Sequence, residues 1–271
     1  MPVQLPTEKQ KTPKEVTRST ILLYGHPKIG KSSFFAQFPD PLFICTERGV
    51  DYQEVFAVYP KDWNEVLQVC AALATQFKAG TLPYKYLVID TLDNAYAMCA
   101  DYVVAKANVK QTGSKFDDPA DLGWGKGFRA IVSEMLRVFN KLQAMDMGIG
   151  FIAHAKEIVA DSETQSGFTR IVPKLSEGVS GALAGFVNVI MIYRVETVKM
   201  EDGKVKTVRV LRTRPSTEYI AGGRLALKDP IVCGDSPEEA FKAFKQAYEE
   251  ADLGRVSAKL AVEPKQRKRS E

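Results

Sequence analysis

The chain has 271 residues, of which 45% are hydrophobic and 26% are charged, and its formal net charge is +4. This length allows one sizeable core with appendages or at most two small domains, and we expect a single domain. The longest apolar runs are shorter than the roughly 20 residues of a membrane helix, and the polar N-terminus lacks a secretory apolar core, so we expect no membrane association and a cytoplasmic location.

The first motif follows an apolar strand predicted at Ile21 to Tyr24. Residues 25–32 read Gly-His-Pro-Lys-Ile-Gly-Lys-Ser, which fits the phosphate-loop pattern G-x-x-x-x-G-K-[ST], and a helix is predicted over Lys31 to Phe38. Such a loop directs backbone N–H groups at one point, where we expect a di- or triphosphate with Mg²⁺. Lys31 is expected to reach the β- and γ-phosphates, and Ser32 to ligate the metal. The predicted nucleotide-binding residues are Gly25, His26, Pro27, Lys28, Ile29, Gly30, Lys31, Ser32 and Ser33.

The second predicted strand, Leu42 to Thr46, is followed directly by Glu47. We expect this strand to lie next to the phosphate-loop strand, where a carboxylate can orient and polarise the water that attacks the γ-phosphate. Glu47 is therefore the candidate catalytic base. The alternative is an exposed loop glutamate that faces solvent.

The third predicted strand ends in an acid. Apolar residues recur every three or four positions from Trp63 to Phe77, which predicts a helix, and Tyr86 to Asp90 then reads as a buried strand of the Walker B type. Because parallel strands deliver their carboxyl ends to one rim of a sheet, we expect the Asp90 carboxylate to hold Mg²⁺. Asp93, at the start of a helix predicted to end at Ala107, either adds to the metal site or caps its helix.

The middle of the chain continues the alternation. We predict a long polar loop over residues 108–125, a helix with an apolar stripe from Phe128 to Leu142, and a central strand from Gly148 to His154. Loops of that length tend to be functional or mobile. Residues 156–174 show little apolar periodicity, and we predict a loop there.

The last third predicts a hairpin and a helix. A strand over Phe186 to Val195 should turn at residues 201–203 (Glu-Asp-Gly) and return through Val205 to Arg214. A final helix is predicted over Ser236 to Ala251, with the serine as its cap. The order of strands and helices predicts an α/β fold with a mostly parallel central sheet flanked by helices and a late β-hairpin.

Cysteine spacing and charge at the chain ends complete the analysis. The four cysteines, at positions 45, 70, 99 and 233, contain no C-x-x-C pair, so we expect buried thiols and neither a zinc site nor a disulfide framework. Residues 255–271 carry six Lys or Arg against two Glu. We predict a polar extension over 1–18, one folded domain over 19–252 and a basic, disordered tail over 253–271, which either contacts nucleic acid or is simply solvated.

The ordered set of segments resembles a known family. GHPKIGKSS, PLFICTERG, YLVIDTLDN, LGWGKGFRA and GIGFIAHAKE are similar to the phage RecA-like ATPases of the single-strand annealing recombinase class (Sak-type), over about Thr20 to Leu227. The resemblance implies a P-loop NTPase with a RecA-like core that binds ATP and single-stranded DNA. It also implies assembly into a homo-oligomer or filament, annealing or strand exchange, a single-strand DNA-binding protein as partner, and action in the bacterial host cytoplasm.

The resemblance also implies roles for individual residues. Lys31, Ser32 and Asp90 match the nucleotide and Mg²⁺ ligands, Glu47 matches the glutamate that ends strand two, and His154 takes the sensor position that reports the γ-phosphate to a DNA-binding loop. That loop would be residues 155–176. Its candidate DNA contacts are Lys156, Phe168, Arg170 and Lys174, since cations on phosphates and a ring under a base serve sequence-tolerant binding.

One departure from the family concerns a late Lys-x-Arg pair that acts across the subunit interface. This chain has Ala-Gly-Gly-Arg at positions 221–224, so Arg224 alone is the candidate to reach a neighbour's γ-phosphate, and an ordinary surface arginine is the alternative. A second function also stays open, in which a nucleotide-switched protein-binding module acts as a loader or regulator without a primary role on DNA.

Overall fold

A computed structural model of the chain describes residues 7, 15–109, 112–162, 165–199 and 205–251. Its strands are β1 (Thr20–Gly25), β2 (Pro41–Cys45), β3 (Phe56–Val58), β4 (Tyr86–Asp90), β5 (Gly148–Ser162), β6 (Gln165–Pro173), β7 (Val189–Lys199), β8 (Val205–Arg212), β9 (Gly222–Gly223) and β10 (Ile231–Val232). Its helices are α1 (Lys31–Phe35), α2 (Trp63–Ala79), α3 (Leu92–Asn108), α4 (Lys126–Gln143), α5 (Glu177–Phe186) and α6 (Pro237–Glu250), with 3-10 turns η1 (Val16–Arg18) and η2 (Pro119–Leu122).

The strands form one sheet in the order β10-β8-β7-β1-β5-β4-β2-β3, with β6 paired to β5 and β9 paired to β7. All strands from β7 to β3 along this path run parallel. The central strands β1, β2 and β4 are buried along their whole length, which is why their sequences are continuous apolar runs instead of alternating ones. The predicted α/β class with a mostly parallel sheet is confirmed.

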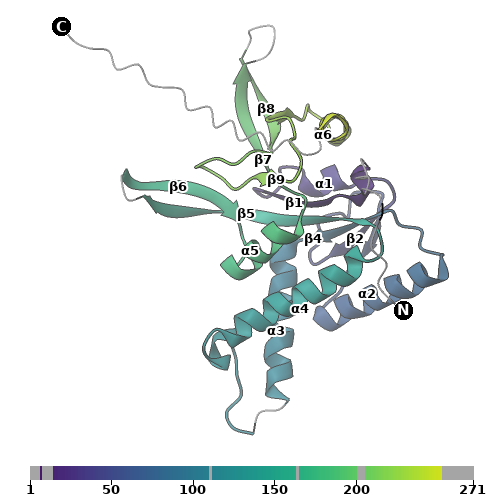
Figure 1. The fold of residues 1–271 in the computed structure, drawn as a ribbon, viewed down its shortest axis with the longest axis vertical. Helices are drawn as coiled ribbons and strands as arrows, with labels where there is room; N and C mark the ends of the chain where they lie inside the picture. The colour runs from purple at the N-terminus through teal and green to yellow at the C-terminus, as the bar shows by residue number, and fades with distance from the viewer. Residues whose placement is uncertain (1–6, 8–14, 110–111, 163–164, 200–204, 252–271) are drawn as a thin grey trace.

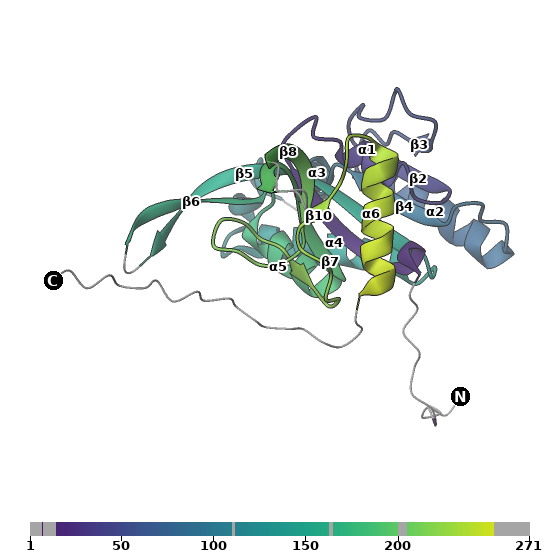
Figure 2. The same ribbon diagram turned by 90° about the horizontal axis from the view of Figure 1, so that it is seen from above.

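Helices cover both faces of the sheet (Figure 1). Helices α2, α3, α4 and α5 pack on one face around residues such as Phe139 and Phe151, while α1 and α6 cover the other face around Phe34 and Phe244. Figure 2 shows α6 lying across the sheet beside α1. The predicted last helix is confirmed, and Ser236 and Glu239 form its capping box.

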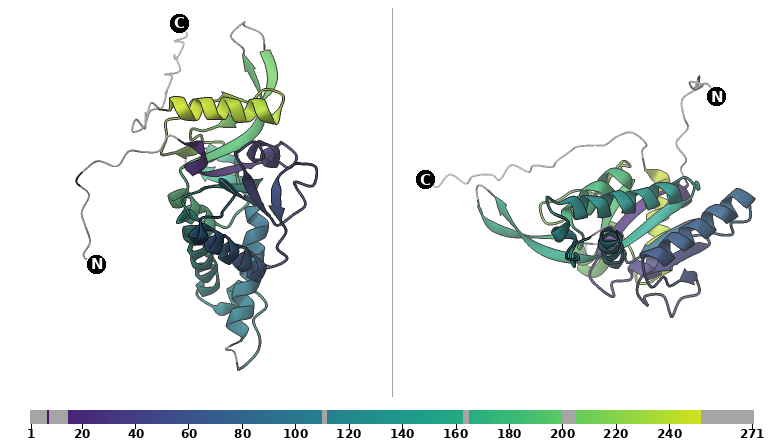
Figure 3. Two further views of the ribbon diagram at one scale, coloured as in Figure 1. Left: turned by 90° about the vertical axis from the view of Figure 1, so that its right-hand side faces the viewer. Right: turned by 90° about the horizontal axis from the view of Figure 1, so that it is seen from below.

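The clearest departure from the sequence-based expectation is a long hairpin. Strand β5 does not end at His154 but continues to Ser162 and pairs with β6, so residues 156–174 are not the predicted loop. The hairpin projects from the body (Figures 1 and 3). Its side chains at 156–159 are all exposed, so no buried face imposes the apolar alternation by which strands are recognised.

A second correction concerns the start of β7. The predicted strand from Phe186 begins instead at Val189, and Phe186 closes α5, a helix that the sequence analysis missed. Ser176 caps α5 by accepting a hydrogen bond from the Val179 amide. The predicted hairpin pairing of β7 with β8 is confirmed, but its turn at residues 201–203 lies outside the described residues, as do almost all of the N-terminal extension and the C-terminal tail.

Two expectations from composition can be compared with the structure. All four cysteines are free and buried, as predicted. Among the described residues, no helix combines the length and apolarity that crossing a bilayer requires.

The start of β5 is packed too tightly for a side chain, which gives a test of the fold. A Cβ on Gly148 would lie 2.6 Å from the backbone oxygens of Thr17 and Ser19. We expect Gly148→Ala to lower the free energy of unfolding by about 1–3 kcal/mol in a urea titration, because backbone atoms cannot move aside. Gly181→Ala is the matched control, since its Cβ meets nothing within 4 Å, and should be neutral or stabilising by up to about 1 kcal/mol. Equal midpoints for wild type and Gly148→Ala would contradict this packing.

Candidate functional site

Strands β1 and β4 end at the site on either side of β5, which continues past it. Gly25 at the end of β1 pairs with His154 on β5, and Asp90 at the end of β4 pairs with Ile152. Strand β5 therefore lies between the phosphate-loop strand and the Walker B strand. The predicted loop, carboxylate and histidine are brought to one rim of the sheet, where ligands of parallel α/β folds bind.

The loop from Gly25 to Ser32 has the backbone that a phosphate cradle requires. Lys28 and Gly30 take positive φ angles of 62° and 108°, and Gly30 immediately precedes α1. A Cβ on Gly25 would clash with the carbonyl oxygen of Tyr193 on the neighbouring strand β7. Helix α1 is only five residues long and shorter than predicted, so the loop amides contribute more to anion binding than the helix does.

Lys31 lies under the loop. Its side chain is 7% exposed, and its Nζ donates hydrogen bonds to the carbonyl oxygens of Gly25 at 3.1 Å and His26 at 2.9 Å. Burial lowers the pKa of Lys31, while the charges of Asp90 and Glu47 act in the opposite direction. The ammonium group therefore lies within the loop and close to the acids of the neighbouring strands.

Asp90 meets Ser32 across the site. The Ser32 hydroxyl donates to Oδ2 of Asp90 at 2.6 Å, and Oδ1 of the same carboxylate is buried without a hydrogen-bond partner. The pKa of Asp90 is raised to about 6, chiefly by burial; the Ser32 hydrogen bond opposes this rise, and the neighbouring charge of Glu47 adds to it. A Cβ on Gly49 would lie 3.2 Å from Asp90 Oδ2 and 3.6 Å from Ser32 Oγ, so only glycine leaves this space open.

These features fit a magnesium ion. An unpaired buried carboxylate oxygen beside a serine hydroxyl is the oxygen donor set that Mg²⁺ takes in nucleotide sites, where phosphate oxygens and water complete the shell. Ser32 and Asp90 are thus the residues that would hold the ion, as the sequence predicted.

Glu47 belongs to a polar chain with His154. Its Oε1 lies 4.0 Å from His154 Nε2, and Asn94 Nδ2 donates to its Oε2 at 3.2 Å. Asp93 holds the other side of the imidazole, with Oδ2 2.9 Å from His154 Nδ1 and Oδ1 accepting from the His154 backbone amide. The Asp93 carboxylate therefore orients His154, a role that its sequence position at the start of α3 did not reveal.

The location expected for the Glu47 strand was wrong. Strand β2 lies beside β4 and β3, three places from β1, and β5 and β7 flank the phosphate-loop strand instead. Glu47 still reaches the site because the residue before it, Thr46, is hydrogen-bonded to the end of the Walker B strand. The Thr46 amide donates to the Asp90 carbonyl at 2.7 Å, and the Thr46 hydroxyl accepts from the Thr91 amide at 2.9 Å.

The sequence analysis did not single out Asn94 or Gln53. Gln53 Nε2 donates to the Ser33 hydroxyl at 2.9 Å, which ties the segment after Glu47 to the phosphate loop. Their only sequence signal is proximity to a motif: Asn94 follows the Walker B strand by four residues, and Gln53 follows Glu47 by six.

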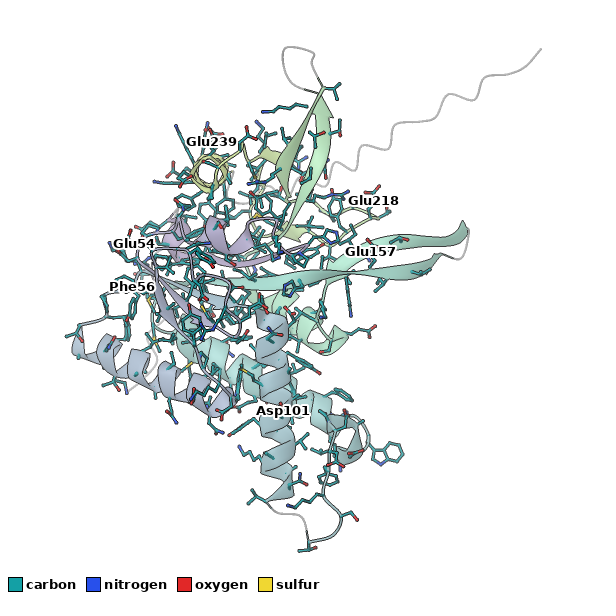
Figure 4. The ribbon with its side chains drawn as sticks, turned by 180° about the vertical axis from the view of Figure 1, so that it is seen from behind. Glu54, Phe56, Asp101, Glu157, Glu218 and Glu239 are labelled. Atoms are coloured by element: carbon teal, nitrogen blue, oxygen red, sulfur yellow. The ribbon has the colours of Figure 1, made fainter. Side chains whose placement is uncertain are left out.

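The four candidate DNA contacts lie on or next to the β5–β6 hairpin. By the two-residue alternation of strands, Lys156, Ile158 and the Ile158 partner Arg170 share one face, while Glu157 lies on the other. Lys156 and Lys174 are exposed, and Phe168 pairs in register with Ala160. Figure 4 shows Glu157 on the projecting hairpin, near Glu218, whose carbonyl accepts from the Ile171 amide of β6.

Arg224 is not brought to the phosphate loop of its own chain. It follows β9, which pairs with the start of β7 at Val189. Gly25 lies beside Tyr193 further along β7, so Arg224 is at the opposite end of these strands. Its guanidinium donates to the carbonyl oxygen of Gly185 near the end of α5 at 2.6 Å. Arg224 is exposed, and its action across a subunit boundary stays a prediction.

The comparison with protein-family models agrees with a nucleotide site. The AAA domain family matches residues 17–225. Among solved structures, a KaiC-like protein from the hyperthermophilic archaeon Pyrococcus horikoshii is similar, with a TM-score of 0.43 and 14% sequence identity over 82% of this chain and 88% of the other. A search of curated proteins finds no match.

The buried Asp90 carboxylate predicts a conflict between binding and stability. Because its pKa in the fold is raised to about 6, ionisation costs the folded protein stability as pH rises from about 4 through 6. We expect Asp90→Asn, in EDTA and without nucleotide, to have a free energy of unfolding about 1–3 kcal/mol larger than that of wild type at pH 7.5. The gain should shrink as pH falls below about 4, and stabilisation by Mg-ATP should be lost. A variant less stable than wild type at pH 7.5 would show that burial of this charge is not the dominant cost.

Glu47 is predicted to act in hydrolysis rather than in binding. We expect Glu47→Gln to bind ATP within about threefold of wild type and to lower kcat by about a hundredfold or more, because the amide cannot accept the proton of the attacking water. Glu54→Gln is the matched control, an exposed glutamate seven residues further on, near β3 (Figure 4). Equal hydrolysis by Glu47→Gln and Glu54→Gln would remove Glu47 from the reaction.

Proposed function

The chain belongs to the AAA domain family and is a P-loop ATPase, and from this premise we propose that it is an ATP-hydrolysing phage recombination protein. In this proposal it binds single-stranded DNA along the β5–β6 hairpin and promotes single-strand annealing or strand exchange. The observation that carries the proposal is the continuity of β5, which contributes His154 to the nucleotide site and Lys156 to the projecting hairpin.

The hydrolytic step uses groups whose places are described above. The loop amides and Lys31 bind the phosphates. Ser32 and Asp90 would hold Mg²⁺, which would supply positive charge against the charge of the phosphates. Glu47 orients a water for in-line attack on the γ-phosphorus and accepts its proton. The P–O bond to the β-phosphate breaks as the new bond forms, leaving ADP and phosphate.

Coupling to DNA rests on the chain of contacts at His154. Its imidazole is fixed by Asp93 and faces Glu47 across 4.0 Å, so a γ-phosphate that changes this arrangement acts directly on β5. Two residues later the same strand carries Lys156, whose Nζ donates to the Leu175 carbonyl at 3.2 Å and so joins both ends of the hairpin. A displacement at the histidine therefore needs no intervening loop to reach the proposed DNA surface.

The Tyr24 hydroxyl gives a second link. It accepts from the Ile220 amide at 2.9 Å and donates to the Ile220 carbonyl at 2.7 Å, and it lies 3.3 Å from the Ile171 carbonyl of β6. Tyr24 directly precedes the phosphate loop. Strand β6 is thus held to β1 as well as paired with β5, which supports a surface that responds to nucleotide.

The test compares ATP hydrolysis with and without single-stranded DNA at two salt concentrations. We expect DNA to stimulate wild type and Lys31→Ala to abolish both rates. The pair Lys156→Gln and Lys174→Gln, made together, should weaken DNA binding about tenfold at low salt and remove the stimulation, since phosphate contacts by cations dominate such binding.

The control for charge is Lys242→Gln with Lys245→Gln, two exposed lysines of α6 on the opposite face of the sheet. It should bind DNA within twofold of wild type. If both double variants lost DNA affinity equally, DNA binding would depend on the overall charge of the protein and not on the hairpin. Tight nucleotide binding by wild type, with no DNA response at low salt, would overturn the proposal and favour a nucleotide-switched protein-binding module.

A further inference from the structure

Two neighbouring residues in the first turn of α3 hold two different partners at the nucleotide site. Asp93 binds His154, with Oδ1 3.3 Å from the backbone amide nitrogen and Oδ2 2.9 Å from the ring nitrogen Nδ1. Asn94 donates from Nδ2 to Oε2 of Glu47 at 3.2 Å. The other oxygen of Glu47, Oε1, faces the imidazole and lies 4.0 Å from Nε2. The same helical turn therefore positions both the candidate base and the histidine beside it.

The Asp93 carboxylate determines which imidazole nitrogen carries the proton. An ionised carboxylate only accepts hydrogen bonds, and a neutral imidazole has one N–H and one lone pair. The contact with Oδ2 at 2.9 Å therefore places the proton of His154 on Nδ1 and leaves the lone pair on Nε2. The 4.0 Å between Nε2 and Oε1 of Glu47 is too long for a hydrogen bond, as expected where two acceptors face each other.

Exposure increases along this series of side chains. Asp93 is 8% exposed, His154 22% and Glu47 38%. The carboxylate that fixes the imidazole is thus buried, while the carboxylate that would meet the attacking water is open to solvent. Because Asp93 also accepts from the His154 backbone amide, it cannot turn away from the ring without leaving a buried polar group unpaired.

We propose that His154 receives the proton that Glu47 takes from the attacking water, and that Asp93 is the positioning residue that keeps Nε2 free to accept it. The proposal rests on the hydrolytic step proposed above, and DNA binding does not enter it.

The proton has a defined path in this step. As the water oxygen bonds to the γ-phosphorus and the P–O bond to the β-phosphate breaks, one O–H bond of water breaks and its proton goes to Glu47. The protonated carboxylate then becomes a donor, approaches Nε2 and transfers the proton to it. The imidazolium lies between the carboxylates of Asp93 and Glu47, which stabilise its charge until the proton leaves to solvent. Glu47 is then ionised again and ready for the next water.

Replacing Asp93 by asparagine should reverse the tautomer. In Asp93→Asn the amide oxygen keeps the His154 backbone amide as its donor, so the amide NH₂ group turns toward Nδ1 and the ring proton moves to Nε2. Nε2 then donates to Glu47 and cannot accept a proton. The same change in the Asp–His pair of serine proteases preserves the geometry and produces the wrong tautomer.

The first measurement is the tautomer itself. The chain has two histidines, so the imidazole nitrogen-15 and proton resonances at pH 7.5 can be assigned by comparison with His154→Gln. We expect the Nδ1–H form in wild type and the Nε2–H form in Asp93→Asn. Asp101→Asn is the matched control, an exposed carboxylate further along the same helix (Figure 4), and should keep the wild-type form. An Nε2–H or doubly protonated imidazole in wild type would overturn the proposal.

The second measurement is ATP hydrolysis without DNA. Asp93→Asn and His154→Gln should each lower kcat by about tenfold or more and leave ATP binding within about threefold of wild type. In a Glu47→Gln background the same two changes should alter kcat by less than about twofold, because no proton reaches the histidine. Losses of equal size in both backgrounds would show that His154 acts on the phosphate directly, and the relay would be wrong.

These outcomes separate the relay from the rest of the proposed function. Both measurements are made without DNA, so a missing DNA response would reject the recombination function and leave the relay standing. Circular dichroism shows whether the variants fold. If Asp93→Asn did not fold, the wild-type spectrum and the His154→Gln comparison would still decide the question.

Discussion

The buried contact between Ser32 and Asp90 is the constraint on which the rest of the site depends. A carboxylate with 1% exposure is costly in an apolar sheet unless polar groups surround it, and here the Ser32 hydroxyl satisfies one of its oxygens. Keeping serine and aspartate together requires β1 and β4 to end close to each other, and their last residues pair with His154 and Ile152 of the shared neighbour β5. One charge, that of Asp90, lies where an ion can bind it. The parallel register brings Ser32 to it, and the glycine at position 49 leaves space beside it.

Strand β5 has two roles that its sequence does not separate. Its first half is buried between β1 and β4, and Gly148 and Gly150 allow close approach of Tyr86 and Phe35. Its second half leaves the body as one side of a hairpin. The change of environment falls at His154, where Asp93 binds both the backbone amide and the imidazole. A residue at that boundary is well placed to convert a change at the phosphate into a movement of the hairpin.

The elements that could be predicted from the sequence are those whose signal is local. The phosphate loop, the Walker B strand and the amphipathic helices were recognised because glycine spacing and apolar periodicity are set by the residues themselves. The β5–β6 hairpin and α5 were missed for physical reasons: residues 156–159 of β5 are all exposed, so no apolar alternation marks the strand, and α5 contains Gly178, Gly181 and Gly185, which weaken a helical signal. The order of strands in a parallel sheet is set by long-range packing, so the neighbour of β2 could not be read from its sequence, although the chemistry of Glu47 could.

The surface proposed for DNA and the helical layer over one face of the sheet are different parts of the fold. The hairpin continues from β5 in the middle of the sheet, whereas α2, α3 and α4 pack together on one face. Asp93 and Asn94 lie at the start of α3, which packs along α4. The expected γ-phosphate site therefore contacts the helical layer at the same two residues that position His154 and Glu47, and this gives nucleotide a physical route to that layer as well as to the hairpin.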